Sequence, residues 1–255
     1  MHVVSLCPSL TELVFDLGRG DALVGITEYC VHPADKVGAV EKVGGTKTPD
    51  VERIVALEPD LVLMNAEENR IEDAERLRAA GLVCHASMPR DTAETAAMVR
   101  SIAAALGREA DGERIARAIE DATRAVRAHA AGRPPVPWAY LIWRKPWMSV
   151  SDDTFAAALL NQAGGRNVFA DAPARYPTLE PAELAARDPR LVLLCTEPFP
   201  FREQHADELA ALTGLPRERF ALADGEYLSW HGSRTPAGIE YAASLIDQGR
   251  RGTRA

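Results

Sequence analysis

The segment with the greatest capacity for chemistry is Tyr-Leu-Ser-Trp-His-Gly-Ser-Arg, at positions 227–234. A neutral imidazole such as that of His231 ligates metal ions, and it also makes hydrogen bonds to ligands or backbone. The guanidinium of Arg234 can make bidentate hydrogen bonds to a phosphate or carboxylate of a ligand, or it can pair with an acidic neighbour in the protein. The segment therefore indicates a ligand site, with both roles open for each of these two residues.

Aromatic side chains gather in the segments that follow predicted strands. Flat rings suit the faces of a planar ligand, and Tyr and Trp add hydrogen-bond donors for its polar periphery. Ordinary core packing is the alternative role for any single ring. The candidate ligand-binding aromatics are Tyr29, Trp147, Tyr176, Phe199, Tyr227 and Trp230.

Catalytic and metal motifs are missing from the sequence. It contains no GxSxG elbow, P-loop or HExxH, so we predict a protein that is not an enzyme. The four cysteines form no CxxC, which leaves a zinc motif unsupported. Cys7 and Cys30 follow predicted strands and could face one another, so a disulfide between them stays open. Cys84 and Cys195 lie in apolar runs and are expected to be buried core thiols.

Composition narrows the function classes further. The chain of 255 residues has 29 basic and 37 acidic side chains of interleaved sign, for a net charge of −8, which argues against nucleic-acid binding. No run of 18 apolar residues predicts a membrane-spanning helix. The start of the chain lacks the pattern of a signal peptide, so we expect either that the sequence as written is cytoplasmic or that an export signal has been lost or replaced.

Short apolar runs alternate with amphipathic helices, which predicts parallel sheets. Ser9 and Glu12 have the spacing of a capping box at the start of the first helix. The longest helix is predicted at residues 110–131, where Ile115, Ile119 and Val126 share one face. At 1.5 Å per residue it would be about 33 Å long. The other expected helices cover 51–57, a segment after the loop 67–69 that ends at Gly81, 92–106, 153–163, 180–187, 206–212 and a final one from 235. Strands are expected at 2–6, 22–26, 61–64, 83–86, 138–142, 191–195 and 220–222.

Two segments of the chain are alike. Residues 51–64 and 181–194 both read as a short helix, a proline turn and a buried strand, with Pro59 corresponding to Pro189. Two copies of one α/β lobe joined by the long helix is the economical interpretation. The predicted parts are an N-terminal lobe at 1–109, a connecting helix at 110–132 and a C-terminal lobe at 133–255. Ligands of such lobes bind beyond the carboxyl ends of the strands.

Several motifs resemble those of a known family. They are SLCPSLTELVFDLG at 5–18, LVGITEYCVHP at 23–33, ERIVALEPDLVL at 52–63, GGRNVF at 164–169 and WHGSRTP at 230–236. They resemble the helical-backbone metal receptor superfamily, the class III substrate-binding proteins of metal-chelate ABC importers, and within it the cobalamin-binding branch. The resemblance covers nearly the whole chain. Asn65 departs from it, because the cobalamin-binding branch often has an aromatic residue at this position.

The resemblance implies two Rossmann-like lobes with mainly parallel sheets, joined by one long backbone helix, with a ligand cleft between the lobes. It implies a periplasmic or surface-anchored monomer that binds cobalamin, with no catalytic cofactor, and delivers it to an ABC permease. Tyr29, Tyr176 and Trp230 would sandwich the corrinoid, and His231 is a possible axial ligand of its cobalt. Glu72 and Glu203 would be permease-docking carboxylates, or otherwise solvated surface groups. The alternatives are a haem or ferric-siderophore binding protein of the same fold, and a cytoplasmic corrinoid-handling chaperone or enzyme.

Overall fold

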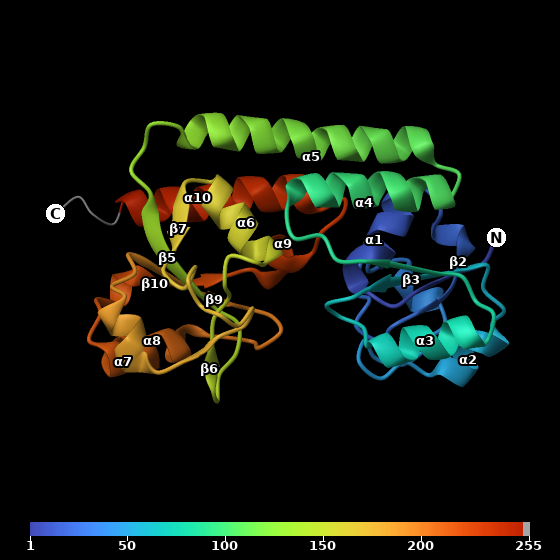
Figure 1. Cartoon of the computed structure of the whole chain (residues 1–255), viewed down its shortest axis with the longest axis horizontal. Coiled ribbons are helices and arrows are strands. Elements are labelled where there is room, and N and C mark those ends of the chain that lie inside the picture. Colours follow the sequence, from blue (N-terminus) through green and yellow to red (C-terminus); the bar gives the residue numbers. More distant parts are fainter. Residues whose placement is uncertain (252–255) are drawn as a thin grey trace. The chain divides into compact units, whose positions relative to one another are not determined.

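A computed structural model describes residues 1–251 as two compact units (Figure 1). Unit 1 comprises Met1–Pro89, Ala93–Ala118 and His231–Arg234, and unit 2 comprises Arg90–Thr92, Ile119–Trp230 and the described residues from Thr235 onward. The long helix is continuous, but the boundary between the two units falls within it, after Ala118. The loop 231–234 belongs to the first unit. Both features differ from the predicted division into two lobes and a separate helix. None of the helices within residues 1–251 is long and apolar enough to span a membrane.

Unit 1 is built on a four-stranded parallel sheet of order β2-β1-β3-β4. Helices α2 and α3 lie on one side of it and α1 and α4 on the other (Figure 1). Its strands are β1 (Val3–Ser5), β2 (Leu23–Ile26), β3 (Leu61–Asn65) and β4 (Cys84–Ser87), and its helices are α1 (Pro8–Asp16), α2 (Val51–Ala56), α3 (Ile71–Ala79), α4 (Thr92–Ala105, from its second residue) and α5 (Glu109–Ala130, up to Ala118).

Unit 2 contains a second parallel sheet, of order β10-β9-β5-β7, and a small antiparallel pair, β6 with β8. Its strands are β5 (Val136–Leu141), β6 (Trp147–Met148), β7 (Gly165–Asn167), β8 (Thr178–Leu179), β9 (Leu191–Cys195) and β10 (Phe220–Ala223); its helices, beside the rest of α5, are α6 (Phe155–Gln162), α7 (Pro181–Ala186), α8 (Glu203–Thr213), α9 (Gly225–Ser229) and α10 (Thr235–Arg251).

The predicted repeat is confirmed by the topology of the two sheets. In each, the first strand lies between the second and the third, and the fourth flanks the third. Helix α2 and strand β3 correspond to α7 and β9, each 130 residues further along the chain. The turn between them repeats as well, since Glu58 and Asp188 both adopt φ 45°. Such a left-handed conformation is uncommon for residues other than glycine, so its repetition indicates one shared α–β turn.

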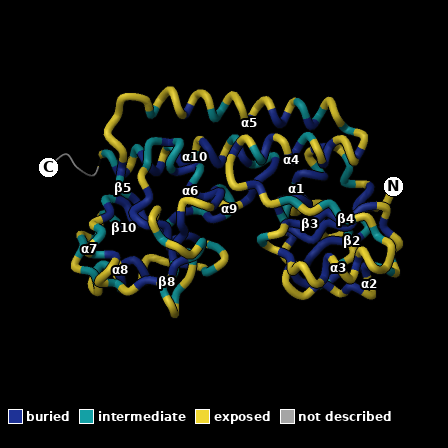
Figure 2. Tube along the Cα trace, viewed as in Figure 1, coloured by how far each residue is buried: buried dark blue, intermediate teal, exposed yellow. Residues whose placement is uncertain are grey.

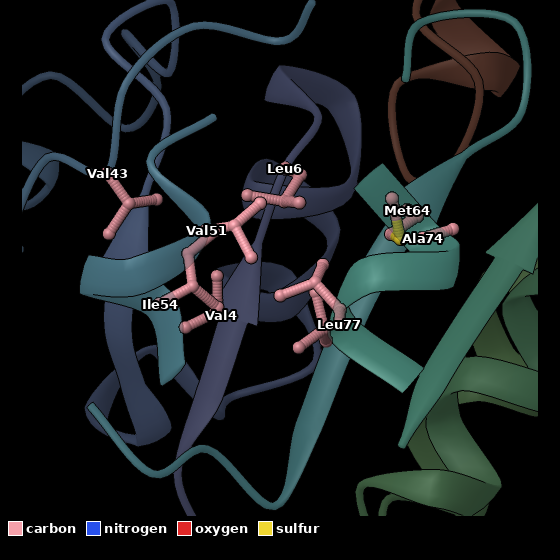
Figure 3. Close-up of a cluster of buried hydrophobic side chains, with 9 residues drawn as sticks. Val4, Leu6, Val43, Val51, Ile54, Met64, Ala74 and Leu77 are labelled. Atoms are coloured by element: carbon pink, nitrogen blue, oxygen red, sulfur yellow. The ribbon is translucent and has the colours of Figure 1, made fainter. Parts of the chain in front are cut away.

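The core of unit 1 explains why its strands have short, continuous apolar sequences. One cluster packs the sheet against α2 and α3 (Figure 3), and every member is at most 7% exposed. Burial on both faces is why parallel strands read as continuous apolar runs rather than as alternating patterns. The cluster comprises Val4, Leu6, Val43, Val51, Ile54, Val62, Met64, Ala74 and Leu77.

Helix α5 buries the predicted face. Ile115, Ile119 and Val126 are at most 6% exposed, while much of the remaining surface of the helix is exposed (Figure 2). The exposed positions include Arg114, Arg117, Glu120 and Arg124. Within unit 1 it approaches α4 closely at Gly112, where a Cβ atom would lie 2.2 Å from the Cβ of Ala103. Helices can approach this closely only where one of them lacks a side chain.

Two local predictions were wrong. Helix α1 begins at Pro8 with Cys7 as its N-cap, and no side chain caps it, so Ser9 and Glu12 do not form a capping box. Proline at the first helical position removes one of the unpaired N–H groups of the first turn, and its fixed φ favours the start of a helix. Cys84 is only half buried, because β4 lies at the edge of its sheet, whereas Cys195 on β9 is fully buried as predicted.

Candidate functional site

The carboxyl edge of each parallel sheet is the expected ligand-binding region. In unit 1, strands β1, β2 and β3 end at Ser5, Ile26 and Asn65. The loop 231–234 lies against this edge, because it contacts both the end of β3 and helix α1. The first site therefore combines strand-end loops of unit 1 with a segment from far along the chain.

Asn65, the last residue of β3, organises the first site. It is 1% exposed, and its side-chain oxygen accepts hydrogen bonds from the backbone N–H groups of Glu67 and Glu68, at 2.8 and 3.1 Å. Its own backbone N–H donates to Oδ1 of Asn69 at 2.8 Å. Asn69 in turn donates through Nδ2 to the carbonyls of Leu6 and Thr46. The loop after β3 is thus held by two buried amide side chains.

His231 is hydrogen-bonded to this network of amide side chains. Its Nε2 lies 2.8 Å from Nδ2 of Asn65, and the imidazole residue is 6% exposed. One nitrogen of this predicted metal-binding imidazole is therefore already in a hydrogen bond with a neighbouring side chain. Among the described residues, no three His, Cys, Asp or Glu side chains group in a way that could hold a metal ion.

Arg234 pairs with an acidic neighbour, which is one of its two predicted roles. Its Nε and Nη2 donate to the two carboxylate oxygens of Glu12 at 2.9 and 2.6 Å, and both side chains are less than a fifth exposed. A two-point contact of this kind is geometrically specific as well as strong. Arg234 thus fastens the loop 231–234 to helix α1.

Buried thiols and hydroxyls lie beneath the same edge. Sγ of Cys30 is 3.1 Å from Oγ1 of Thr11 and 3.2 Å from Oγ1 of Thr27, and Sγ of Cys7 is 3.3 Å from Oγ of Ser9. All four cysteines are free thiols, so the disulfide left open above is not formed. Burial, followed by the charge of Glu68, raises the pKa of Cys7 to about 12. Because the thiolate is the reactive form, Cys7 is a poor nucleophile at neutral pH.

The only exposed predicted ligand residue of unit 1 is Tyr29, in the loop after β2. Its side chain is 60% exposed, and its ring lies beside Gly45. A large aromatic ring held at a sheet edge with most of its surface in solvent is available to a ligand. Tyr29 therefore stays a candidate wall for a flat molecule.

An aromatic cluster occupies the carboxyl edge of unit 2. We define it as Trp143, Trp147, Phe199, Phe201 and His205. Trp147 stacks on Phe201 with the centroids 6.0 Å apart and the planes 8° apart, and Phe199 contacts both Phe201 and Trp143 edge-on. Trp143 lies in the loop after β5 and Trp147 in β6, whereas Phe199 and Phe201 lie in the loop after β9 and His205 in α8. Trp143 is 41% exposed.

Charged groups border the aromatic cluster. Arg144 donates two hydrogen bonds to Glu208, at 3.0 and 2.7 Å, and lies 5.7 Å from the centroid of the Trp147 ring. The contact with Arg144 lowers the pKa of Glu208. Lys145 has φ 67°, a costly conformation for a residue with a side chain, and such strain concentrates at functional sites. A small pocket here is lined by Arg144, Lys145, Pro146, Trp147, Leu179, Glu180 and Glu208.

The other predicted aromatics of unit 2 lie in separate environments. Trp230 is 8% exposed and donates through Nε1 to Glu197 at 2.7 Å. Burial raises the pKa of Glu197, although the indole hydrogen bond opposes that shift. Tyr227 packs on Tyr241 with the centroids 5.2 Å apart, and Tyr176 lies under the guanidinium of Arg175. These three rings are not members of the aromatic cluster.

The two predicted docking carboxylates lie on exposed first turns of helices. Glu72 in α3 has a side chain that is 61% exposed and is 3.4 Å from Arg70. Glu203 in α8 is 70% exposed and forms an ion pair with Arg217. Both helices follow the third strand of their own sheet, so the two positions are related by the repeat.

The structure thus brings His231 and Arg234 together in unit 1, and Trp147 and Phe199 together in unit 2. Sequence reasoning missed four partners of the site residues: Glu12 for Arg234, Asn69 for Asn65, Glu197 for Trp230 and His205 for Phe199. A signal was present for Asn69, because two asparagines four residues apart at the end of a buried strand are typical of a loop closed by side-chain amides. Nothing local pointed to Glu12, whose partner is 222 residues away.

Comparison with known proteins places the chain in a family. The family described as "Periplasmic binding protein" matches residues 3–214. The vitamin B12-binding protein of Vibrio parahaemolyticus is 28% identical over 191 residues, 75% of this chain and 69% of that protein. The vitamin B12-binding protein of Vibrio cholerae serotype O1 is 21% identical over 245 residues, 96% of this chain and 88% of that protein.

Solved structures share the fold over nearly the full length. The periplasmic vitamin B12 binding protein BtuF of Vibrio cholerae has a TM-score of 0.85 at 20% identity, covering 98% of both chains. The periplasmic heme-binding protein RhuT from Roseiflexus sp. RS-1 has a TM-score of 0.82 at 25% identity, covering 97% of this chain and 98% of that one. Because the family match spans most of the sequence and the fold agrees throughout, this chain belongs to the periplasmic binding protein family.

Proposed function

We propose that this protein binds a corrinoid, with cobalamin as the expected ligand, as the non-enzymatic substrate-binding component of an ABC importer. The observation that carries the proposal is the match to relatives named vitamin B12-binding proteins along most of the chain. The aromatic cluster of unit 2 and the exposed ring of Tyr29 support it, because flat apolar surfaces suit a macrocycle.

Haem is the second candidate ligand, since the structure of a heme-binding relative is nearly as similar. One observation disfavours it. A haem site commonly takes an axial ligand from the protein, often a histidine, and Nε2 of His231 is already hydrogen-bonded to Asn65. The two candidates therefore predict different dependence on the side chains of the first site.

Calorimetric and spectroscopic titration with cyanocobalamin, haemin and a ferric siderophore tests the proposal. We expect cyanocobalamin to bind with a sub-micromolar Kd and the other two more weakly. Trp147→Ala should weaken cyanocobalamin binding about tenfold, or ~1.4 kcal/mol, because a flat contact surface is lost.

Leu212→Ala is the matched control for that variant. Leu212 is an exposed apolar residue of α8 outside the aromatic cluster, so its truncation should leave the affinity unchanged. Circular dichroism checks that both variants fold. Failure of all three ligands to bind below the micromolar range would refute the binding proposal, and preferential binding of haemin would favour the second candidate.

We further propose that Glu72 and Glu203 dock the protein to its permease. Exposed carboxylates on helices that correspond in the two copies of the repeat suit recognition by basic residues, and charged side chains at the edge of an interface act mainly on association rate and specificity. The double variant Glu72→Ala/Glu203→Ala should bind cyanocobalamin normally but fail to stimulate ATP hydrolysis by the reconstituted permease. The control Glu52→Ala/Glu218→Ala removes two other exposed carboxylates and should retain stimulation. Equal stimulation by all three proteins would contradict the assignment.

A further inference from the structure

The orientation of the Asn65 amide follows from its partners. Its Oδ1 lies 2.8 and 3.1 Å from the backbone nitrogens of Glu67 and Glu68. Backbone N–H groups can only donate, so the oxygen of the amide must face them. The NH2 group consequently faces His231, 2.8 Å from Nε2. The nearby Asn69 supports this arrangement, because its Oδ1 accepts from the backbone N–H of Asn65.

The protonation of His231 follows in turn. An amide NH2 has hydrogens and no lone pair to offer, so Nε2 of His231 must be the acceptor. In a neutral imidazole one nitrogen accepts while the other carries the hydrogen, which places the proton on Nδ1. The in-plane lone pair of Nε2 accepts the hydrogen bond from Asn65. The corresponding in-plane position of Nδ1 carries the proton. Such an imidazole has no nitrogen lone pair available to a metal ion unless it leaves Asn65.

We infer that Asn65 is a positioning residue that holds His231 as the Nδ1–H tautomer and withholds it from the metal of the bound ligand. On this basis His231 acts as a hydrogen-bonding residue and not as a metal ligand. The second part of the inference rests on the proposed corrinoid function, whereas the tautomer of His231 does not.

The chain contains a matched control. His205 in α8 is also buried, and its Nδ1 accepts a hydrogen bond from the backbone N–H of Arg202 at 3.0 Å. The proton of neutral His205 must therefore be on Nε2, and the side-chain amide of Gln204, 3.5 Å away, would present its oxygen to that proton. The two histidines should show opposite tautomers in one sample, and only that of His231 should depend on Asn65.

The first experiment uses the ligand-free protein. Two-bond ¹H–¹⁵N correlation spectra of histidine-labelled protein distinguish the tautomers, and His231→Ala identifies the signals of His231. We expect Nδ1–H for His231 and Nε2–H for His205. Asn65→Leu should shift His231 toward Nε2–H, and Asn65→Asp, which keeps the oxygens but removes the NH2, should give Nε2–H or the doubly protonated ring.

The signals of His205 should be unchanged in both variants, which also verifies folding. An Nε2–H tautomer of His231 in the wild type, or a tautomer that is the same in all three folded proteins, overturns the inference.

The second experiment uses aquocobalamin, whose axial water an imidazole can replace. Its visible spectrum should be unchanged on binding to the wild type, should shift to that of an imidazole-coordinated corrinoid in Asn65→Leu, and should be unchanged in Asn65→Leu/His231→Ala. A shift in the wild type that His231→Ala abolishes overturns the withholding role, as does a bound spectrum in Asn65→Leu that never shifts. If no corrinoid binds, the proposed function fails and the withholding role fails with it, while the spectra of the ligand-free protein still decide the tautomer.

Discussion

At the scale of single residues, the pair of Arg234 and Glu12 connects the loop 231–234 to helix α1 of unit 1. The two side chains form a two-point ion pair and are 16% and 17% exposed. Ion pairs removed from water are costly to break, because the remaining charge loses its partner but does not fully regain its hydration.

We therefore expect Arg234→Met or Glu12→Gln to lower the free energy of unfolding by about 2 kcal/mol each. A double-mutant cycle measured by urea unfolding should give a coupling of about 1–3 kcal/mol. The pair of Arg217 and Glu203 is the control, because its carboxylate is 70% exposed and such surface pairs contribute little. Equal coupling in the two cycles would show that burial does not strengthen the Arg234 pair.

At the scale of elements, the packing of α5 on α4 depends on Gly112. In an isolated helix Gly112→Ala would be favourable by about 1 kcal/mol, because alanine has the higher helix propensity. Here the added methyl would lie 2.2 Å from Cβ of Ala103, so the helices would have to separate. Overpacking of this kind costs about 1–3 kcal/mol.

We accordingly expect Gly112→Ala to destabilise the protein. The double variant Ala103→Gly/Gly112→Ala should recover most of the lost stability, since Ala103→Gly makes room for the new methyl group. The control Ala118→Gly, at an exposed position of the same helix, should cost about 1 kcal/mol through propensity alone. Thermal unfolding followed by circular dichroism measures all three. A higher Tm for Gly112→Ala would mean that α4 and α5 do not pack closely at this point.

At the scale of the whole chain, the repeat is the feature that sequence and structure share most fully. The proline turn at Pro59 and Pro189 predicted two equivalent helix–strand units, and both sheets have the same strand order. Continuous apolar runs such as Leu61–Met64 identified the central strands, because parallel strands are buried on both faces. The short β6 and β8, the edge strand β7 and helix α9 were not predicted, since two to five residues carry too little periodic signal.

The sequence by itself determined the two α/β units, the long helix and the loops that carry the candidate residues. These features are encoded by local patterns: apolar periodicity, glycine and proline at the ends of helices, and a recurring helix–strand motif. The amphipathic face of residues 110–131 is an example, because Ile115, Ile119 and Val126 are all buried in the fold.

The tertiary structure alone decided what those candidate residues do. The sequence allows Arg234 to bind an anion or to pair with a carboxylate. It likewise allows His231 to ligate a metal or to make a hydrogen bond. Their partners, Glu12 and Asn65, are 222 and 166 residues away along the chain. The role of a polar side chain depends on the donors and acceptors within about 3 Å of it, and only folding brings such distant groups together.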